Sequence, residues 1–219
     1  MKKKIGILAY IIFAIGGFTA VLCVSEWREV FTLLTTQHPF VMGFAKFALL
    51  ATAGELIAAR MASGSFRVPC KIVYRFVIWG LIGMWITLMM KAFNTFAASG
   101  MLPLPEAEGW RRLLIAFYTS VIMNTGFGPT FMALHKCSDC YLERWSQGLS
   151  KGITDVIDAV DWKRFATFTI GKTVPFFWIP AHTLTFLLPG QYQVVSAAFL
   201  SVALGILLNL KRKERVARA

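Results

Sequence analysis

The stretch "IGILAYIIFAIGGFTAVLCV" (residues 5–24) decides the fold class, because it runs for twenty residues without a charged side chain. At about 1.5 Å of rise per residue, a helix of this length just crosses a hydrocarbon layer of roughly 30 Å. Of the 219 residues, 57% are hydrophobic and 16% are charged, and the mean hydropathy is +0.61. A soluble domain is far less apolar, so the sequence predicts an all-α, polytopic transmembrane helix bundle.

Five further apolar runs predict five more spans. They cover residues 41–59, 72–90, 113–134, 165–188 and 191–210. The first run follows three lysines, as a signal peptide would, but it exceeds the roughly 7–15 apolar residues of a signal peptide, so we expect a retained anchor. The sequence therefore predicts one integral membrane domain of about six spans over residues 1–219.

The positions of lysine and arginine predict the orientation, since basic loops stay in the cytoplasm. With the N-terminus there, the cytoplasmic segments hold 17 of the 23 basic residues. Both termini are thus expected in the cytoplasm, and the net charge of +12 is largely a topology signal. The basic tail, residues 211–219, is expected to meet anionic lipid headgroups. No basic stretch alternates with aromatic residues on a soluble module, so no nucleic-acid partner is expected.

The polar segment 141–164 carries apolar residues at helical intervals, which favours a helix on the membrane surface. These are Leu142, Trp145, Leu149, Ile153, Val156 and Val160. Gly148 and Gly152 each cost a helix about 1 kcal/mol, so a broken helix is the alternative.

The motif "HKCSDC" places His135, Cys137 and Cys140 just after the fourth run. A CxxC pair can cycle through a disulfide or supply two ligands to zinc. No second CxxC exists to complete a structural zinc site, and Cys23 and Cys70 are isolated. We therefore interpret the pair as two ordinary reduced thiols and expect no cofactor. A membrane thiol oxidoreductase stays open as an alternative.

Three charged residues lie well inside the apolar runs, namely Lys46, Glu55 and Lys172, whereas Arg75, near the start of the third run, is counted with the loop before it. A charge at the centre of the bilayer costs about 2.5–3.5 kcal/mol on insertion scales, and it commonly marks a functional site. Glu55 and Lys172 have similar expected depths, so they can form a pair. The alternative is that Glu55 reaches the interface beside Arg60 while both lysines extend toward the surface along their aliphatic stems.

The fifth run contains "TVPFFWIPAHTLTFLLP" (residues 173–189). Pro175 and Pro180 are expected to kink or interrupt this span, and the carbonyl groups they release need partners from neighbouring helices or water. His182 in this run and Asn124 in the fourth add polar groups at membrane depth. A tolerated kink in a packed helix is the alternative to a polar cavity.

Three blocks, in order, resemble the Mpv-seventeen family, also called the twenty-two-kilodalton peroxisomal membrane protein family. "QHPFVMGFAKFALLATAGELIAARM" (37–61) is similar to its His-Pro and Gly-Asp block, and "GFGPTF" (126–131) to its Gly-Phe-Ala-Pro segment. The third block resembles the family's Trp-Pro, Asn-Phe and Val-Pro signature through Trp178, Pro180, Ala181, Phe186 and Pro189. The resemblance covers residues 36–210, and the first span has no counterpart in the short members.

The chain departs from the family pattern at polar positions. Met123 and Asn124 replace an Asp-Gln pair, His182 stands where the family favours Gln, and Thr185 where it favours Asn. The resemblance implies a helical bundle of a mitochondrial inner, peroxisomal or bacterial membrane that passes small solutes or maintains membrane homeostasis. It does not carry a substrate over to this chain.

Together these observations predict a non-enzymatic channel or transporter for small solutes, including anionic metabolites. The candidate pore or substrate-binding residues are Lys46, Glu55, Asn124, Lys172, Trp178, Pro180, His182 and Thr185. No Arg-rich presequence precedes the first run, which favours a bacterial cytoplasmic membrane. A scaffold that transports nothing is an alternative, and homo-oligomerisation stays open.

Overall fold

The computed structural model of the chain is all-α and describes residues 2–218, with the side chains of residues 4–210. The side chains of the expected basic tail, residues 211–219, lie outside this described part. The chain forms two compact units. One comprises Met1–Thr87 together with Val194–Ala219, and the other comprises Leu88–Gln193. We call them the first and the second unit and describe each separately.

Within residues 2–218, four helices are long and apolar enough to cross a membrane, which indicates an integral membrane protein. They are Lys4–Cys23, Pro39–Ser63, Ile72–Ala98 and Gly190–Leu210. They coincide with four of the six expected spans, and these four predictions are confirmed at the level of length and composition.

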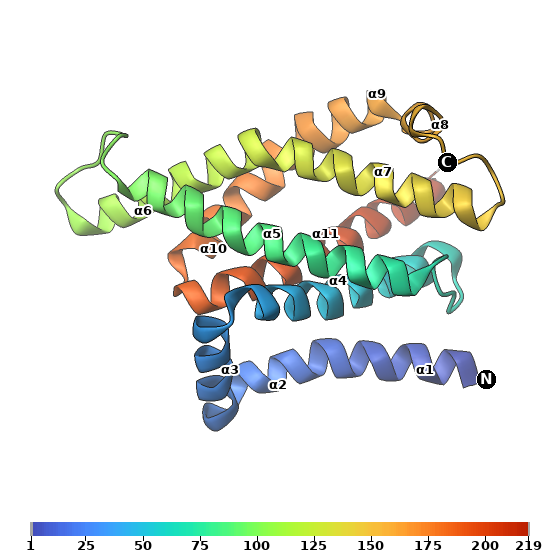
Figure 1. The fold of residues 1–219 in the computed structure, drawn as a ribbon, viewed down its shortest axis with the longest axis horizontal. Helices are drawn as coiled ribbons and strands as arrows, with labels where there is room; N and C mark the ends of the chain where they lie inside the picture. Colours follow the sequence, from blue (N-terminus) through green and yellow to red (C-terminus); the bar gives the residue numbers. More distant parts are fainter. Residues whose placement is uncertain (1, 219) are drawn as a thin grey trace. The chain divides into compact units, whose positions relative to one another are not determined.

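The first unit begins with a continuous helix followed by a short helix that the sequence analysis did not anticipate. The continuous helix comprises α1 (Lys2–Ile11), a π-helical turn η1 (Ile12–Gly16) and α2 (Gly17–Cys23). Val24 adopts an extended backbone and turns the chain into α3 (Ser25–Gln37). Pro39 then starts α4 (Pro39–Ser63), where its missing N–H costs no helical hydrogen bond. Figure 1 shows α3 running across the ends of α2 and α4.

Glycines allow α4 and α5 (Ile72–Ala98) to approach closely. A Cβ atom on Gly83 would collide with the carbonyl oxygen of Gly43, and one on Gly80 would collide with the ring of Phe44. Within the same unit, Gly54 of α4 faces Val202 of α11 (Gly190–Arg218). Small residues therefore set the spacing of these helices, as is common in membrane bundles.

The second unit contains two long helical segments (Figure 1), and each has a π-helical part. One consists of α6 (Glu108–Ile122), η2 (Met123–Phe127) and α7 (Gly128–Ser146), and the other of α9 (Trp162–Arg164), η3 (Phe165–Trp178) and α10 (Ile179–Leu187). They contain the expected spans 113–134 and 165–188, which are not among the four long apolar helices. Polar residues such as Asn124, Lys172 and His182 make these two segments less apolar than the other spans.

The prolines do not interrupt the fifth expected span, so the expectation of a broken helix is wrong, and the helix is distorted instead. Pro175 lies inside η3, a π-helical stretch of 14 residues. Pro180 lies in the first turn of α10, which follows η3 directly. A π-helix bonds residues five apart, so its hydrogen-bond pattern differs from that of the α-helix that a proline disrupts. The expected turn into the sixth span is present, since α11 begins at Gly190 directly after Pro189.

The single surface helix expected over residues 141–164 is replaced by the broken alternative. The helix α7 ends at Ser146, and Gly148 follows with a left-handed backbone, φ +70°. Such a φ favours glycine, which lacks the Cβ that would be strained there. Only a short helix, α8 (Ile153–Asp158), follows before α9. Val156 and Val160 pack against Cys140 of α7.

Candidate functional site

Besides Thr119, four polar side chains are buried inside the second unit, on the α6–η2 segment and on α10. They are Ser120, Asn124, His182 and Thr185. Asn124 is 2% exposed and His182 is 6% exposed. Buried polar side chains in an apolar helix pair need partners, because an unpaired group costs roughly 1–3 kcal/mol.

Asn124 and His182 are partners across the two helical segments. The Nδ2 atom of Asn124 donates to the carbonyl oxygen of Ser120 over 2.8 Å, which orients the amide. The Nδ1 atom of His182 lies 3.0 Å from Nδ2 of Asn124 and 3.1 Å from its Oδ1. Either the amide nitrogen donates to Nδ1 or the amide oxygen accepts from it, depending on the tautomer of the ring.

Both arrangements leave the Nε2 atom of His182 for another partner. If Nδ1 accepts, Nε2 carries the hydrogen and is a donor; if Nδ1 donates, Nε2 is an acceptor. Among the described residues, Nε2 is buried and has no hydrogen-bond partner. The ring therefore presents one unused polar atom inside the second unit.

Aromatic side chains flank this imidazole. The Trp178 ring lies 5.1 Å from the His182 ring, with an angle of 30° between their planes. Phe186, one turn further along α10, meets His182 edge-on at 6.4 Å. These contacts restrict the orientation of the imidazole, so Nε2 holds a defined position.

Ser120 connects α6 with the start of α10. Its hydroxyl donates to the carbonyl oxygen of Ile179 over 2.7 Å. The Thr185 hydroxyl donates within its own helix, to the carbonyl oxygen of Ala181 over 3.0 Å. Ser120 was absent from the candidates, although it lies one turn before Asn124 and shares its helix face.

The structure thus brings three of the eight sequence candidates into contact, namely Asn124, Trp178 and His182, and Thr185 is buried one turn after His182 on α10. Lys172 and Pro180, in the same unit, are exposed. Their exposed positions separate them from the buried polar cluster formed by Ser120, Asn124, His182 and Thr185. From here on, "polar cluster" refers to these four residues.

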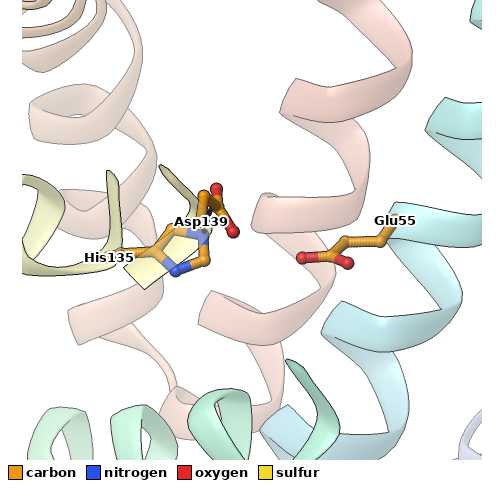
Figure 2. Close-up of side chains that lie close together, drawn as sticks. All are labelled: Glu55, His135 and Asp139. Atoms are coloured by element: carbon orange, nitrogen blue, oxygen red, sulfur yellow. Dashed lines mark ion pairs between the residues drawn. The ribbon is translucent and has the colours of Figure 1, made fainter. Parts of the chain in front are cut away.

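Glu55 projects from α4 in the first unit (Figure 2) and is engaged by α5. Its Oε1 atom accepts a hydrogen bond from Nε1 of Trp79 over 2.8 Å and lies 3.4 Å from Nη1 of Arg75. The Nε atom of Arg75 in turn donates to the carbonyl oxygen of Cys70 over 3.0 Å. Glu55 therefore has an ion-pair partner, Arg75, on the adjacent helix. The sequence analysis counts Arg75 among the loop residues.

Lys46 is a fully buried residue of α4. Its ammonium group donates to Oγ1 of Thr35 over 2.9 Å and lies 4.4 Å from the centre of the Phe31 ring. Both partners belong to α3, and a cation over an aromatic face is attractive. Lys46 thereby attaches α3 to α4.

The histidine and the two cysteines of "HKCSDC" have different neighbours. The Nε2 atom of His135 lies 3.7 Å from Oδ2 of Asp139, one turn along α7 (Figure 2). Among the described side chains, His135, Cys137 and Cys140 do not form a group with metal-ligand spacing. All four cysteines are free thiols.

The environment of Cys140 is that of a packing residue. It lies against Val156 and Val160, with Cys137 beside this cluster. Burial raises the pKa of the Cys140 thiol, and nearby Lys136 opposes this in part. A reactive thiol needs a lowered pKa, so this environment does not favour redox chemistry.

Comparisons with protein-family models, with curated proteins and with solved structures find no match for the chain. The polar cluster is therefore the observation on which a function has to be argued. It combines burial, a defined geometry and one unused hydrogen-bonding atom in a membrane protein.

Proposed function

We propose that this chain is a six-span, non-enzymatic membrane protein that passes small polar solutes through the second unit. The four long apolar helices supply four spans. Residues 113–134 and 165–187, within the two segments of the second unit, supply the other two. They are more polar because they carry the solute path. The charge asymmetry supports both termini in the cytoplasm and a bacterial cytoplasmic membrane, with a mitochondrial inner or peroxisomal membrane as the alternative.

The single observation that carries the proposal is the Nε2 atom of His182, buried without a partner beside the Asn124 amide. Polar groups inside membrane segments are costly, and they commonly mark substrate or ion pathways. A purely structural cluster would satisfy all its members, as Ser120 and Asn124 are satisfied. The unused atom is therefore assigned to a passing solute.

The chemistry of the cluster indicates the class of solute. A hydroxyl group can both donate and accept, so it can bind Nε2 in either tautomer of His182. The neighbouring groups are a serine, a threonine and an amide, which carry no charge. Small hydroxyl-bearing solutes, such as glycerol, fit this set best. Small carboxylates are the competing class. They fit less well, because a carboxylate only accepts hydrogen bonds and so binds Nε2 only when Nε2 donates.

Flux measurements on reconstituted protein test the proposal. The purified chain in liposomes is challenged with glycerol, urea and lactate, and solute entry is followed by stopped-flow light scattering. Protein-free liposomes supply the background. We expect the largest increase over background for glycerol.

The separate solutes keep the outcomes distinct. Entry of lactate alone would indicate that the solutes are small anions and not uncharged hydroxyl compounds. Anionic metabolites are part of the sequence-based prediction. Background entry of all three solutes, with protein shown to be folded by circular dichroism, would refute the transport function and favour the scaffold alternative.

A further inference from the structure

The helix α3 presents three different faces. Phe31 and Thr35 face Lys46 of α4, and Phe31 is only 3% exposed. Trp27, Val30 and Leu34 form a second stripe, and they are 54%, 56% and 40% exposed. These positions follow the spacing of one face of an α-helix. Arg28, Glu29, Thr32 and Thr36 make up a third, polar face.

A hydrogen bond between the helix before α3 and the helix after it allows the heights of the two ends of α3 to be compared along the axes of these helices. The Tyr10 hydroxyl of α1 donates to the carbonyl oxygen of Leu49 in α4 over 3.1 Å. From this level, Cys23 lies about 20 Å further along the first helix, and Pro39 about 15 Å back along α4. The ends of α3 thus differ in level by roughly 5–10 Å, although an α-helix of 13 residues is about 20 Å long.

This arrangement fits a helix that lies across the spans, which is also how Figure 1 shows it. The helix before α3 and the helix after it are both candidate membrane spans. A helix that runs across the ends of two spans lies parallel to the membrane plane. Its level is that of the end of the first span, where the hydrocarbon layer meets the headgroups.

We infer that α3 is an in-plane membrane-surface helix, with Trp27, Val30 and Leu34 inserted at the boundary between headgroups and acyl chains. Tryptophan is enriched at this boundary, and an apolar stripe beside a polar face is typical of helices that lie in it. The stripe continues the exposed apolar surface of the first span, where Ile12 and Phe13 are exposed too. The occupant of this face is therefore lipid.

The position of Lys46 supports the same placement. Lys46 lies seven residues into α4 from Pro39, about 10 Å below the end of the helix. Its ammonium group reaches up to Thr35 of α3. Long basic side chains in membrane spans extend toward the interface in this way. The hydroxyl of Thr35 is then part of the polar surface that the ammonium group reaches.

Site-directed spin labelling of the reconstituted full chain tests the orientation. The background replaces the native cysteines by Cys23→Ser, Cys70→Ser, Cys137→Ser and Cys140→Ala. Single cysteines are then introduced as Trp27→Cys, Val30→Cys and Leu34→Cys, with Thr36→Cys on the polar face as the matched control. The relative access of oxygen and of a water-soluble nickel reagent gives the depth of each label.

We expect the three stripe labels to lie at nearly the same shallow depth and to favour oxygen, whereas the Thr36→Cys label favours the nickel reagent. An upright α3 would instead give depths that differ by about 10 Å between positions 27 and 34, and this would overturn the inference. Stripe labels shielded from both reagents would show that a second copy of the chain covers the face, which would also overturn it.

A second measurement uses the chain with its native cysteines and avoids the multiple substitutions. Lipids brominated near the headgroup end of the acyl chain quench tryptophans at that depth. The quenchable part of the fluorescence should fall in Trp27→Phe relative to the unsubstituted protein. Identical quenching of the two proteins would contradict the placement of Trp27 at the boundary.

Discussion

The amide nitrogen of Asn124 lies 3.0 Å from Nδ1 of His182, and this contact joins the two segments of the second unit that contain π-helix. Asn124 lies in η2, and His182 follows η3 by one turn. π-Helical turns in membrane and soluble proteins are frequently found at functional sites. The contact therefore couples the geometry of the proposed solute path to the distortion of both helices.

The Asn124–His182 pair predicts a non-additive effect on stability. Asn124→Leu leaves Nδ1 of His182 without its partner and should destabilise the protein by about 1–3 kcal/mol. The double variant Asn124→Leu, His182→Leu removes both polar groups and should be less destabilised than the single one. Thermal unfolding in detergent measures both. A double variant that is destabilised as much as Asn124→Leu, or more, would show that the two side chains are not coupled.

The Glu55–Arg75 ion pair predicts a structural role for Glu55. Arg75→Met removes a cation that lies 3.4 Å from the mostly buried Glu55 carboxylate and should cost about 3 kcal/mol. The exposed Arg67, changed to Gln, is the control and should cost less than about 0.5 kcal/mol. Equilibrium unfolding in detergent gives both values. A change of solute selectivity in Glu55→Gln at unchanged stability would return Glu55 to the solute path.

The close approach of α4 and α5 predicts that Gly83 tolerates no side chain. Gly83→Ala pushes a methyl group against the backbone of Gly43 and should cost about 1–3 kcal/mol through overpacking. Gly6→Ala is the control, since nothing lies within 4 Å of a Cβ at that position. Thermal midpoints compare the two variants. Equal midpoints would mean that these helices are further apart than described.

The thiols predict an order of labelling rates. With single-cysteine variants at neutral pH, maleimide should modify Cys140 more slowly than Cys137, because Cys140 is buried and burial raises the pKa of its thiol. The reacting form is the thiolate, so the difference should narrow as the pH rises. Faster reaction of Cys140 would reopen the thiol oxidoreductase alternative.

The sequence was sufficient for features that depend on composition along the chain. Twenty apolar residues in a row predict a spanning helix whatever surrounds it, and four such runs are long helices in the structure. Asn124 and His182 could be singled out in the same way, since a polar residue in an apolar run is conspicuous. Their mutual contact could not, because it depends on the pairing of two helices.

Other features depend on hydrogen-bond register or on three-dimensional neighbours. The helix α3 has apolar residues on two faces and no long apolar run, so composition gives no signal for it. Ser120 is an ordinary residue in a membrane helix until its hydroxyl meets the carbonyl oxygen of Ile179. Arg75 lies only three residues after the start of α5, so its pairing with Glu55 becomes visible only once α4 and α5 are packed together.

The central claim is that Nε2 of His182 contacts the passing solute, and glycerol flux tests it most directly. His182→Phe keeps an aromatic ring beside Trp178 but removes both ring nitrogens, Nε2 among them. Thr183→Val is the matched control, because that hydroxyl bonds only within its own helix, to the carbonyl oxygen of Ile179. Loss of one hydrogen bond of about 1.4 kcal/mol should lower the flux roughly tenfold in His182→Phe. Flux equal to that of Thr183→Val, at equal amounts of folded protein, would contradict the claim.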